Sequence, residues 1–323
     1  MKPVVFIPES IAAAGIDLLA PHCECITPWR NATPPGPEQL REMLTGADAV
    51  IVRLFKVGDA DLQRCPKLKV IGKHGVGVDN IDCKAAAARG VRVIFTPAAN
   101  ANAVAEHAVT LMLALARQIG PASRAIAEGA FNQRSRFEGV ELAGKTLAVL
   151  GLGRIGSRVA EIAATGLAMK VLGYDPLLPP DRYTGPARFP TALDDIFPQA
   201  DFISLHVPLT PQTKHLLNAA SLARCKPACR IVNTSRGAVI DEAALAAALE
   251  KGVIAGAALD VFEVEPVPAD HPLCRVPNLL LTPHISSSTR ESLERMSRDA
   301  AQGVLDVLQG RPPKHPVNPE ALP

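Results

Sequence analysis

Residues 149–156 of this chain read Val-Leu-Gly-Leu-Gly-Arg-Ile-Gly, and they carry the strongest structural signal in the sequence. The apolar run at 146–150 predicts a buried parallel strand, and the alanine-rich pattern at 155–165 predicts a helix directly after the glycines. Glycines at this spacing let the backbone N–H groups at a helix N-terminus point toward phosphate oxygens. The stretch therefore predicts a strand–turn–helix unit that binds a dinucleotide.

Each residue of this turn has a predicted role. Gly151 permits the tight turn, Gly153 lets the backbone approach a pyrophosphate, and Gly156 lets the helix pack close to the strand. Arg154 and Ile155 open the helix, so we place them in the same cofactor-binding group.

A second apolar run ends at Asp175, 19 residues after Gly156. An acidic residue about 20 residues beyond the glycines is where a ribose hydroxyl is held, which argues against a glycine turn that binds nothing. A carboxylate there accepts hydrogen bonds from a 2′-hydroxyl and repels a 2′-phosphate, and the neighbouring Tyr174 and Pro176 offer no cation. We therefore predict NAD(H) rather than NADP(H) as the cofactor.

Composition limits the classes of protein to consider. The 323 residues exceed the size of one ordinary hydrophobic core, so two domains are expected. Apolar residues make up 48% and charged residues 20% of the chain, which is typical of a folded globular protein. A net charge of +2 without a long basic run gives no reason to expect a nucleic-acid or membrane partner.

The cysteines and the start of the chain indicate a cytoplasmic protein. The seven cysteines are odd in number and match no zinc spacing, and the histidines form no HExxH motif. We therefore predict free thiols in a reducing cytoplasm and no metal site. Residues 3–8 predict a first strand rather than a signal peptide, and no apolar stretch is long enough to span a bilayer.

Strand and helix patterns alternate along the N-terminal part of the chain. The predicted strands are 4–8, 24–27, 49–53, 70–73 and 92–95, and the helices between them include 11–19, 37–44, 59–65 and 81–89. Such alternation predicts a parallel sheet that is covered by helices on both faces.

A long helix at 101–118 and a polar, irregular region up to Gly144 precede a second α/β series. The strands of that series are predicted at 146–150, 170–174, 202–205, 230–233, 256–259 and 279–282, and the last long helix at 289–309. We expect two doubly wound α/β domains with parallel sheets. A flavodoxin-like substrate domain comprises 1–98 and 287–323, and a central Rossmann NAD-binding domain comprises 99–286.

Three polar residues follow predicted strands of the second series, at the edge where open parallel sheets bind ligands. Arg236 can bind a carboxylate bidentately and polarise a neighbouring carbonyl. His284 can exchange a proton with an oxygen, and Glu265 can hold the other imidazole nitrogen and favour its charged form. Taken singly, each has a structural alternative: a strand-end cap, a satisfied histidine or a solvated loop charge. Together they match an electrophile, an acid–base group and its orienting partner.

Several motifs in this order resemble the D-isomer-specific 2-hydroxyacid dehydrogenase family, which includes phosphoglycerate, glycerate/hydroxypyruvate and D-lactate dehydrogenases. The resemblance runs from Val4 to about Pro316. Its motifs are 75–82, the glycine turn, 233–237, 260–266 and 283–285. It implies an NAD-dependent oxidoreductase (EC 1.1.1.-) that transfers hydride reversibly between nicotinamide and C2 of a small D-2-hydroxy acid or 2-oxo acid.

The resemblance also assigns site residues. It implies that Arg236, Glu265 and His284 are the catalytic triad and that Asp260 orients the nicotinamide carboxamide. The implied substrate-binding residues are Val76 and Gly77, through their backbone N–H groups, with Leu54 and Asn100. The other implied cofactor-binding residues are His206, Val207, Pro208, Thr213, Thr234, Ser235 and Ser286. The run at 286–288 is three serines, where many family members carry glycine or alanine after the His-Ile pair, so the pocket lining there stays open.

The substrate stays open among hydroxypyruvate, glyoxylate and 3-phosphoglycerate. Arg53 or Lys56 could hold a second anion, and Lys73 and His74 could contact a hydroxyl or an anionic tail. Ordinary strand-end or surface charge is the alternative for all four residues.

Two other functions are weighed against this one. The first is a non-catalytic NAD(H)-sensing scaffold, like the corepressors that resemble this family. The second is a formate-type dehydrogenase, and Glu265 argues against it because hydride removal from formate needs no protonating His–Glu couple. The resemblance further implies a homodimer formed through the NAD-binding domain. Because the chain ends at Pro323, we also expect it to lack the C-terminal regulatory domain of longer phosphoglycerate dehydrogenases.

Overall fold

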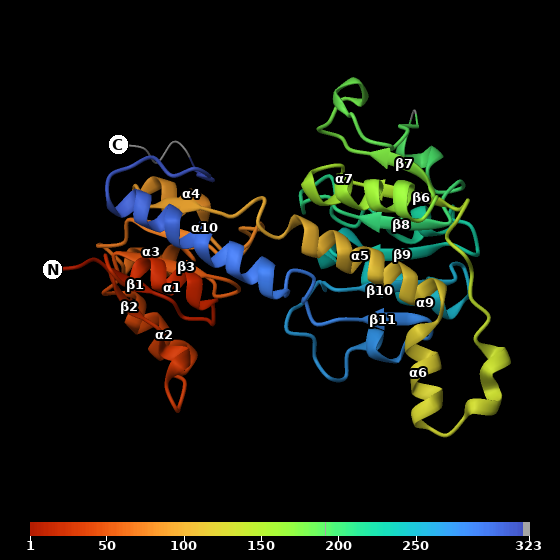
Figure 1. Cartoon of the computed structure of the whole chain (residues 1–323), viewed down its shortest axis with the longest axis horizontal. Coiled ribbons are helices and arrows are strands. Elements are labelled where there is room, and N and C mark those ends of the chain that lie inside the picture. Colours follow the sequence, from red (N-terminus) through yellow and green to blue (C-terminus); the bar gives the residue numbers. More distant parts are fainter. Residues whose placement is uncertain (191, 319–323) are drawn as a thin grey trace. The chain divides into compact units, whose positions relative to one another are not determined.

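The computed structural model describes residues 1–190 and 192–318, and the chain divides into two compact units. Unit 1 contains Met1–Asn100 and the chain from Ser288 onward, and unit 2 is Ala101–Ser287. The divisions between the two units fall at 100/101 and 287/288. The boundaries predicted from the sequence are 98/99 and 286/287. The last long helix, α10 (Arg290–Leu308), belongs to unit 1, so the end of the chain returns to the first part of the fold (Figure 1).

The sheet of unit 1 is parallel and has the strand order β2-β1-β3-β4-β5. This is the flavodoxin-like order, and it confirms the fold class expected for this unit. The strands lie within the five predicted runs and are β1 (Val4–Phe6), β2 (Glu24–Ile26), β3 (Ala49–Val52), β4 (Val70–Lys73) and β5 (Arg92–Ile94).

Helices cover both faces of this sheet because the strands are apolar on both faces. The helices other than α10 are α1 (Ala13–Leu19), α2 (Pro37–Leu44), α3 (Asp59–Gln63) and α4 (Cys83–Ala88), with a short 3₁₀ turn at Pro28–Arg30. On one face, α1 and α10 bury Ile16 and Val304 against the sheet. On the other face, α2, α3 and α4 bury Leu44, Leu62 and Ala86.

The sheet of unit 2 is also parallel, with the order β11-β10-β9-β8-β6-β7. Its strands are β6 (Thr146–Leu150), β7 (Lys170–Tyr174), β8 (Phe202–Leu205), β9 (Arg230–Asn233), β10 (Gly256–Leu259) and β11 (Leu279–Leu281). The order reverses at β6, which has β7 on one side and β8 on the other. Ligands of such sheets bind at the carboxyl ends of the strands at this reversal.

Two layers of helices enclose the sheet of unit 2. Helices α5 (Ala101–Ala116) and α7 (Arg154–Glu161) lie on one face (Figure 1). They bury small residues such as Ala108 and Ala160 there. Helices α8 (Ala219–Leu222) and α9 (Glu242–Glu250) cover the other face with Leu222 and Leu245. A π-helical turn follows α7 at Ile162–Gly166, and the 3₁₀ turns are Phe131–Arg136, Pro180–Arg182, Leu193–Asp195, Gly237–Val239 and Pro272–Arg275.

The region after α5 corrects one expectation. It was predicted to be irregular, but it contains helix α6 (Ile119–Ala127), separated from α5 by Gln118 in a left-handed conformation with φ of 51°. The adjacent Gly120 and Pro121 read as helix breakers in the sequence. Both lie in the first turn of α6, where the missing N–H of a proline costs no hydrogen bond. Across the described residues, every helix is too short or too polar to cross a bilayer.

Candidate active site

The glycine turn between β6 and α7 is surrounded by backbone on its inner side. Gly151 has φ of +98°, which favours glycine, and its N–H donates to the Tyr174 carbonyl oxygen at 2.7 Å. A Cβ atom on Gly151 would lie 2.6 Å from the carbonyl carbon of His206, and one on Gly156 would lie 1.8 Å from the Gly151 oxygen. The end of β6 therefore packs directly against the ends of β7 and β8.

Gly153 has the opposite surroundings. Apart from Gly153 itself and its two chain neighbours, no atom of the described residues lies within 4 Å of the position that a Cβ on Gly153 would take. Gly153 is the residue before α7, where the first N–H groups of the helix have no partner within the helix. Arg154 is exposed and Ile155 half-buried in the first turn of α7. Open space beside these N–H groups is what a pyrophosphate requires.

Asp175 lies at the end of β7 and holds the turn in place. Its carboxylate accepts the N–H of Leu152 at 2.9 Å and the N–H of Leu177 at 2.9 Å. Each carboxylate oxygen has a further lone pair, so the half-exposed group can still accept a hydrogen bond from a ribose hydroxyl.

The segment after β8 contains four of the predicted cofactor-binding residues. His206 Nε2 lies 2.8 Å from the Ser204 hydroxyl, and burial lowers the pKa of His206 to about 3, so its ring is neutral at pH 7. Val207 is buried and Pro208 is exposed. The Thr213 hydroxyl donates to the Pro208 carbonyl oxygen at 2.6 Å. Thr213 is therefore a buried residue whose hydrogen bond joins it to the start of the segment at Pro208.

The loop after β9 is organised by Asn233, a buried residue to which the sequence reasoning assigned no role. Its Oδ1 accepts both the N–H (3.0 Å) and the hydroxyl (2.8 Å) of Ser235, and its Nδ2 donates to the Arg236 carbonyl oxygen at 2.9 Å. Between them, the Thr234 hydroxyl is buried and has no hydrogen-bond partner among the described residues. Such an unsatisfied buried group fits a site that is completed by a bound cofactor.

Gly237 brings this loop against the loop after β10. A Cβ atom on Gly237 would lie 1.8 Å from the carbonyl carbon of Phe262, so a side chain there would collide with backbone. Arg236 precedes this contact, and its guanidinium donates to the Ser235 carbonyl oxygen at 2.6 Å. The close approach places the strand-end arginine on a loop in direct contact with the segment that leads to Glu265.

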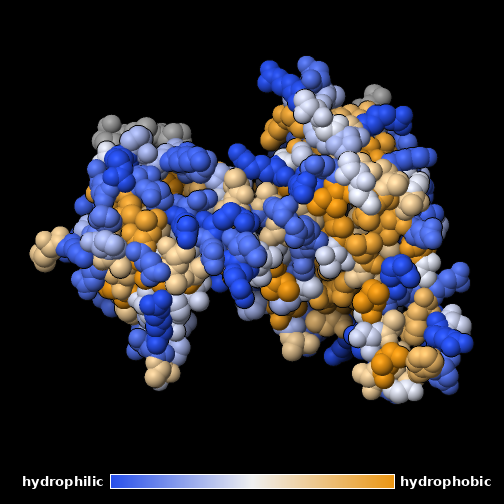
Figure 2. Space-filling model, viewed as in Figure 1, coloured by the Kyte–Doolittle hydropathy of each residue, from blue (hydrophilic) through white to orange (hydrophobic). Residues whose placement is uncertain are grey.

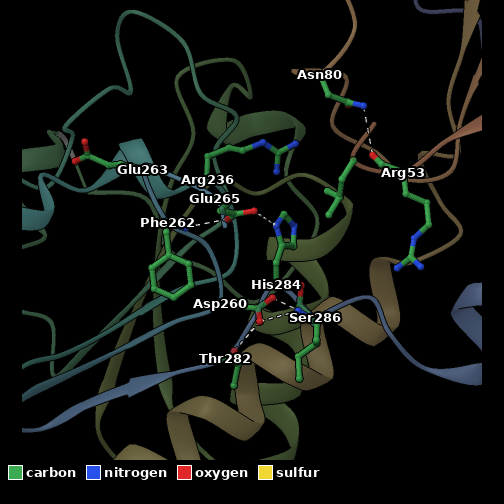
Figure 3. Close-up of polar contacts among 12 residues, drawn as sticks. Arg53, Asn80, Arg236, Asp260, Phe262, Glu263, Glu265, Thr282, His284 and Ser286 are labelled. Carbon is green, nitrogen blue, oxygen red and sulfur yellow. Dashed lines mark hydrogen bonds and ion pairs between the residues drawn. The ribbon is translucent and has the colours of Figure 1, made fainter. Parts of the chain in front are cut away.

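Asp260 anchors the segment that carries His284. Its carboxylate is fully buried and accepts the Thr282 hydroxyl (2.6 Å) and the N–H groups of Ile285 (2.9 Å) and Ser286 (2.8 Å) (Figure 3). A further partner, which was not predicted from the sequence, is His107 on α5, whose Nε2 lies 3.6 Å from Asp260 Oδ1 and 3.3 Å from Thr282 Oγ1.

These contacts decide the charge of Asp260. Burial acts to raise its pKa, but the contact with His107 and the hydrogen bonds from Thr282 and the two backbone N–H groups outweigh burial and lower the pKa to about 2. The group is therefore ionised at neutral pH, and its first role in this structure is to hold residues 282–286.

We expect Asp260→Asn to lower the free energy of unfolding by about 2 kcal/mol at pH 7. The lowered pKa means that the ionised carboxylate stabilises the fold above pH 4 and that this contribution is lost as the pH falls toward 2. Thermal melts of both proteins from pH 7 to pH 3 would show a difference that shrinks on acidification. Asp181→Asn, at an exposed aspartate of the same unit, is the control. A difference that does not change with pH would contradict this account.

His284 and Glu265 form a hydrogen-bonded pair. His284 Nδ1 lies 2.7 Å from Glu265 Oε2, and Glu265 Oε1 accepts the Phe262 N–H at 3.0 Å (Figure 3). His284 has φ of 52°, a strained conformation for a non-glycine residue, in a segment held by Asp260. Burial acts to raise the pKa of Glu265, but the His284 contact and the Phe262 N–H lower it below its usual range. An ionised Glu265 therefore orients the ring through Nδ1, and Nε2 is left to exchange a proton with a ligand.

In unit 1, the loop after β4 contains Val76 and Gly77. It begins at Gly75, which has φ of 146° and whose N–H donates to the Thr96 hydroxyl at 3.0 Å. In the part of the chain that the structure describes, the N–H groups of Val76 and Gly77 donate no hydrogen bond. Two successive unpaired N–H groups in a half-exposed loop are suited to binding a carboxylate.

The other residues predicted to touch substrate have different environments. Leu54 is 61% exposed, on the loop after β3, the strand that pairs with β4. Asn100 is buried, and its Oδ1 has no partner among the described residues. The Arg53 guanidinium donates to the Ser10 carbonyl oxygen at 3.1 Å, and Lys56 is exposed.

His74, by contrast, is buried and contacts another residue of unit 1. Its Nε2 lies 3.0 Å from the Ser297 hydroxyl on α10. Burial, together with the charge of Arg53, lowers the pKa of His74 to about 4, so the ring is neutral at pH 7. The contact with α10 supports the structural alternative for this residue.

Taken together, the fold and the site define a dinucleotide-binding α/β protein with a hydrogen-bonded His–Glu pair on the loops that follow two strands. Residues 109–286 match the NAD-binding domain of the D-isomer specific 2-hydroxyacid dehydrogenases. The D-3-phosphoglycerate dehydrogenase of Synechocystis sp. is 41% identical over 315 residues, which are 97% of this chain and 56% of that protein. The chain thus spans about half the length of this relative.

Two shorter relatives match along nearly their whole length. The glyoxylate reductase of Korarchaeum cryptofilum is 37% identical over 328 residues, covering 100% of this chain and 98% of that protein. The crystal structure of an NADPH-dependent glyoxylate/hydroxypyruvate reductase from Sinorhizobium meliloti, in complex with NADP and malonate, is similar with a TM-score of 0.85 and 27% identity, covering 99% and 98% of the two chains. This chain belongs to the D-isomer specific 2-hydroxyacid dehydrogenase family, and its unit 2 contains the NAD-binding domain of that family. None of these similarities supports the non-catalytic alternative.

Proposed function

We propose that the protein is an NAD-dependent D-2-hydroxyacid dehydrogenase that reduces a small 2-oxo acid, such as glyoxylate, hydroxypyruvate or 3-phosphohydroxypyruvate, and catalyses the reverse oxidation. The observation that carries this proposal is the 2.7 Å hydrogen bond between His284 Nδ1 and Glu265 Oε2, in the unit that contains the NAD-binding domain. Both directions of the reaction need one group that donates and accepts a proton, and this pair supplies it.

The cofactor fits residues of unit 2. The N–H groups after Gly153 would hold the pyrophosphate, and Asp175 would hold the adenosine ribose. The buried Thr234 hydroxyl, which has no partner among the described residues, would form a hydrogen bond with the cofactor. We assign the remaining predicted residues, Arg154, Ile155, His206, Val207, Pro208, Thr213, Ser235, Asp260 and Ser286, to the surroundings of this site. When bound, NAD(H) supplies or accepts the hydride at C2 of the substrate.

The chain's own residues complete the chemistry. In unit 2, the guanidinium of Arg236 would bind the substrate carboxylate and polarise the 2-oxo group. In unit 1, the N–H groups of Val76 and Gly77 are a second group of donors suited to a carboxylate. During reduction, His284 donates its Nε2 proton to the developing alkoxide, and Glu265 stabilises the charged ring that exists before this transfer. During oxidation, neutral His284 accepts the hydroxyl proton. Leu54 and Asn100 line the substrate region in this proposal.

Assembly and location form part of the proposal. Four apolar side chains on α5, α6 and the following 3₁₀ turn are exposed: Leu113, Ile119, Ile126 and Phe131. Figure 2 shows apolar surface gathered over α6, and a second copy of the chain would cover it, which supports a homodimer formed through unit 2. The cysteines of the chain are not joined in disulfides, the state that a reducing cytoplasm maintains.

The test of this function is the oxidation of NADH by the purified protein with glyoxylate, hydroxypyruvate, pyruvate and 3-phosphohydroxypyruvate. We expect rapid turnover of at least one of them and a preference for NADH over NADPH, because the Asp175 carboxylate repels a 2′-phosphate. Oxidation of formate is expected to be absent. Tight NADH binding without turnover of any of these acids would overturn the proposal.

A further inference from the structure

Three successive backbone N–H groups in unit 1 are bound by one internal carboxylate. They belong to Arg53, Leu54 and Phe55, in the loop directly after β3. Glu9 Oε2 accepts all three, at 2.7, 2.9 and 2.9 Å, and Glu9 Oε1 also accepts the Leu54 N–H at 2.9 Å. Converging N–H groups of this kind form an anion-binding concavity, and here the anion is a side chain of the same chain.

The carbonyl side of the same loop is held as well. The buried Lys73 ammonium donates to the Arg53 carbonyl oxygen and to Asn80 Oδ1. The Asn80 amide in turn donates to the Phe55 carbonyl oxygen at 2.7 Å and to that of Arg53 at 3.4 Å (Figure 3). The backbone of this short exposed loop is therefore fixed from both sides, at the end of a strand that neighbours β4.

Unit 1 therefore contains two groups of N–H donors that could bind an anion, and they differ in whether they already have a partner. The N–H groups of residues 53–55 are occupied by Glu9, whereas those of Val76 and Gly77 are not used within the described residues. The Leu54 N–H is consequently not available to a ligand, and only its exposed side chain is presented. A charge-assisted acceptor shared by three donors fixes the backbone from which that side chain projects.

We propose that Glu9 is a positioning residue of the reaction: its carboxylate fills the anion-binding concavity of residues 53–55 and so fixes Leu54 where the 2-oxo acid is bound. This inference rests on the proposed function. Glu9 itself takes no part in proton or hydride transfer. Its effect falls on substrate binding, because a displaced binding group misaligns the substrate, and a displacement of about 1 Å can cost up to about a hundredfold in rate.

The test compares Glu9→Ala with wild type and with Glu24→Ala, a control at an exposed glutamate of the same unit. For Glu9→Ala, we expect KM for the preferred 2-oxo acid to rise roughly tenfold, while KM for NADH is unchanged. Added acetate, a small carboxylate that can enter the vacated concavity, is expected to restore much of the loss. The Glu24→Ala protein should behave as wild type with and without acetate.

Amide hydrogen exchange provides a readout that needs no turnover. In wild type the amides of residues 53–55 should exchange slowly; in Glu9→Ala they should exchange fast, and acetate should slow them again. If Glu9→Ala does not fold, Glu9→Gln keeps the size of the side chain but loses the charge, and a smaller rise in KM and a smaller increase in exchange at residues 53–55 are expected, without rescue by acetate. A folded Glu9 variant with wild-type exchange at 53–55 and wild-type KM would overturn the inference. An inactive wild type whose slow exchange at residues 53–55 depends on Glu9 would overturn the proposed function, while the structural contact between Glu9 and this loop would stand.

Discussion

Replacement of His284 by alanine is expected to lower kcat with the preferred 2-oxo acid by about a thousandfold or more, without weakening NADH binding. General acid–base groups contribute about 10²–10⁴-fold to such rates. Among the described residues, His284 is the only side chain that is hydrogen-bonded to Glu265, so no neighbouring side chain on Glu265 replaces the lost ring. Steady-state kinetics together with titration of NADH fluorescence would measure both quantities on the same protein.

Two further variants make this test specific. Glu265→Gln can still accept a hydrogen bond from Nδ1 but carries no negative charge, so we expect a smaller loss of kcat than for His284→Ala. His22→Ala, at an exposed histidine of unit 1, should have wild-type kinetics. Wild-type kcat in His284→Ala would show that another group transfers the proton.

Replacement of Gly156 by alanine is expected to disrupt the cofactor turn. The new Cβ would lie 1.8 Å from the Gly151 carbonyl oxygen, and no rotation of a side chain can relieve a contact between two backbone-attached atoms. We expect the free energy of unfolding to fall by about 3 kcal/mol or more and NADH binding to be lost. Chemical denaturation and NADH titration would measure the two effects.

Gly153→Ala is the matched comparison within the same turn. Gly153 has φ of −67°, which alanine adopts readily, and the described residues leave the position of its Cβ open. We expect stability within about 0.5 kcal/mol of wild type. NADH affinity should nevertheless fall at least tenfold, because the methyl group occupies space that the pyrophosphate needs. Equal effects of the two substitutions on stability and binding would argue against the phosphate role of this turn.

The course of the backbone was largely predictable because its signals are local. A parallel strand buried on both faces is a short apolar run, and the strand Thr146–Leu150 matches its predicted limits. Helix α6 escaped prediction because Gly120 and Pro121 usually mark a break, and only the position of the helix start makes them tolerable. The same local spacing made Gly151, Gly153 and Gly156 recognisable.

Candidate site residues could be named from the sequence only where they come shortly after a predicted strand. Arg236 follows β9, and Glu265 and His284 follow β10 and β11, so the order of the strands was enough to propose that they act together. Asn233 was not assigned a role because its side-chain amide forms hydrogen bonds with the backbone of Ser235 and Arg236, in the loop that follows it. The residue type alone does not reveal such a contact.

The apolar periodicity and the glycine spacing were sufficient to predict two parallel α/β sheets and a dinucleotide turn, and to name three catalytic candidates at strand ends. Each of these signals lies within about 20 residues of chain. The polar contacts that hold these parts needed the folded chain. His107 approaches Thr282 across 175 positions of sequence, and Glu9 binds the N–H of Leu54 across 45. A histidine on a helix or a glutamate after a strand has many possible partners in the sequence. Packing of the helices and strands selects one of them, because a buried polar group is stable only where a partner lies within hydrogen-bonding distance.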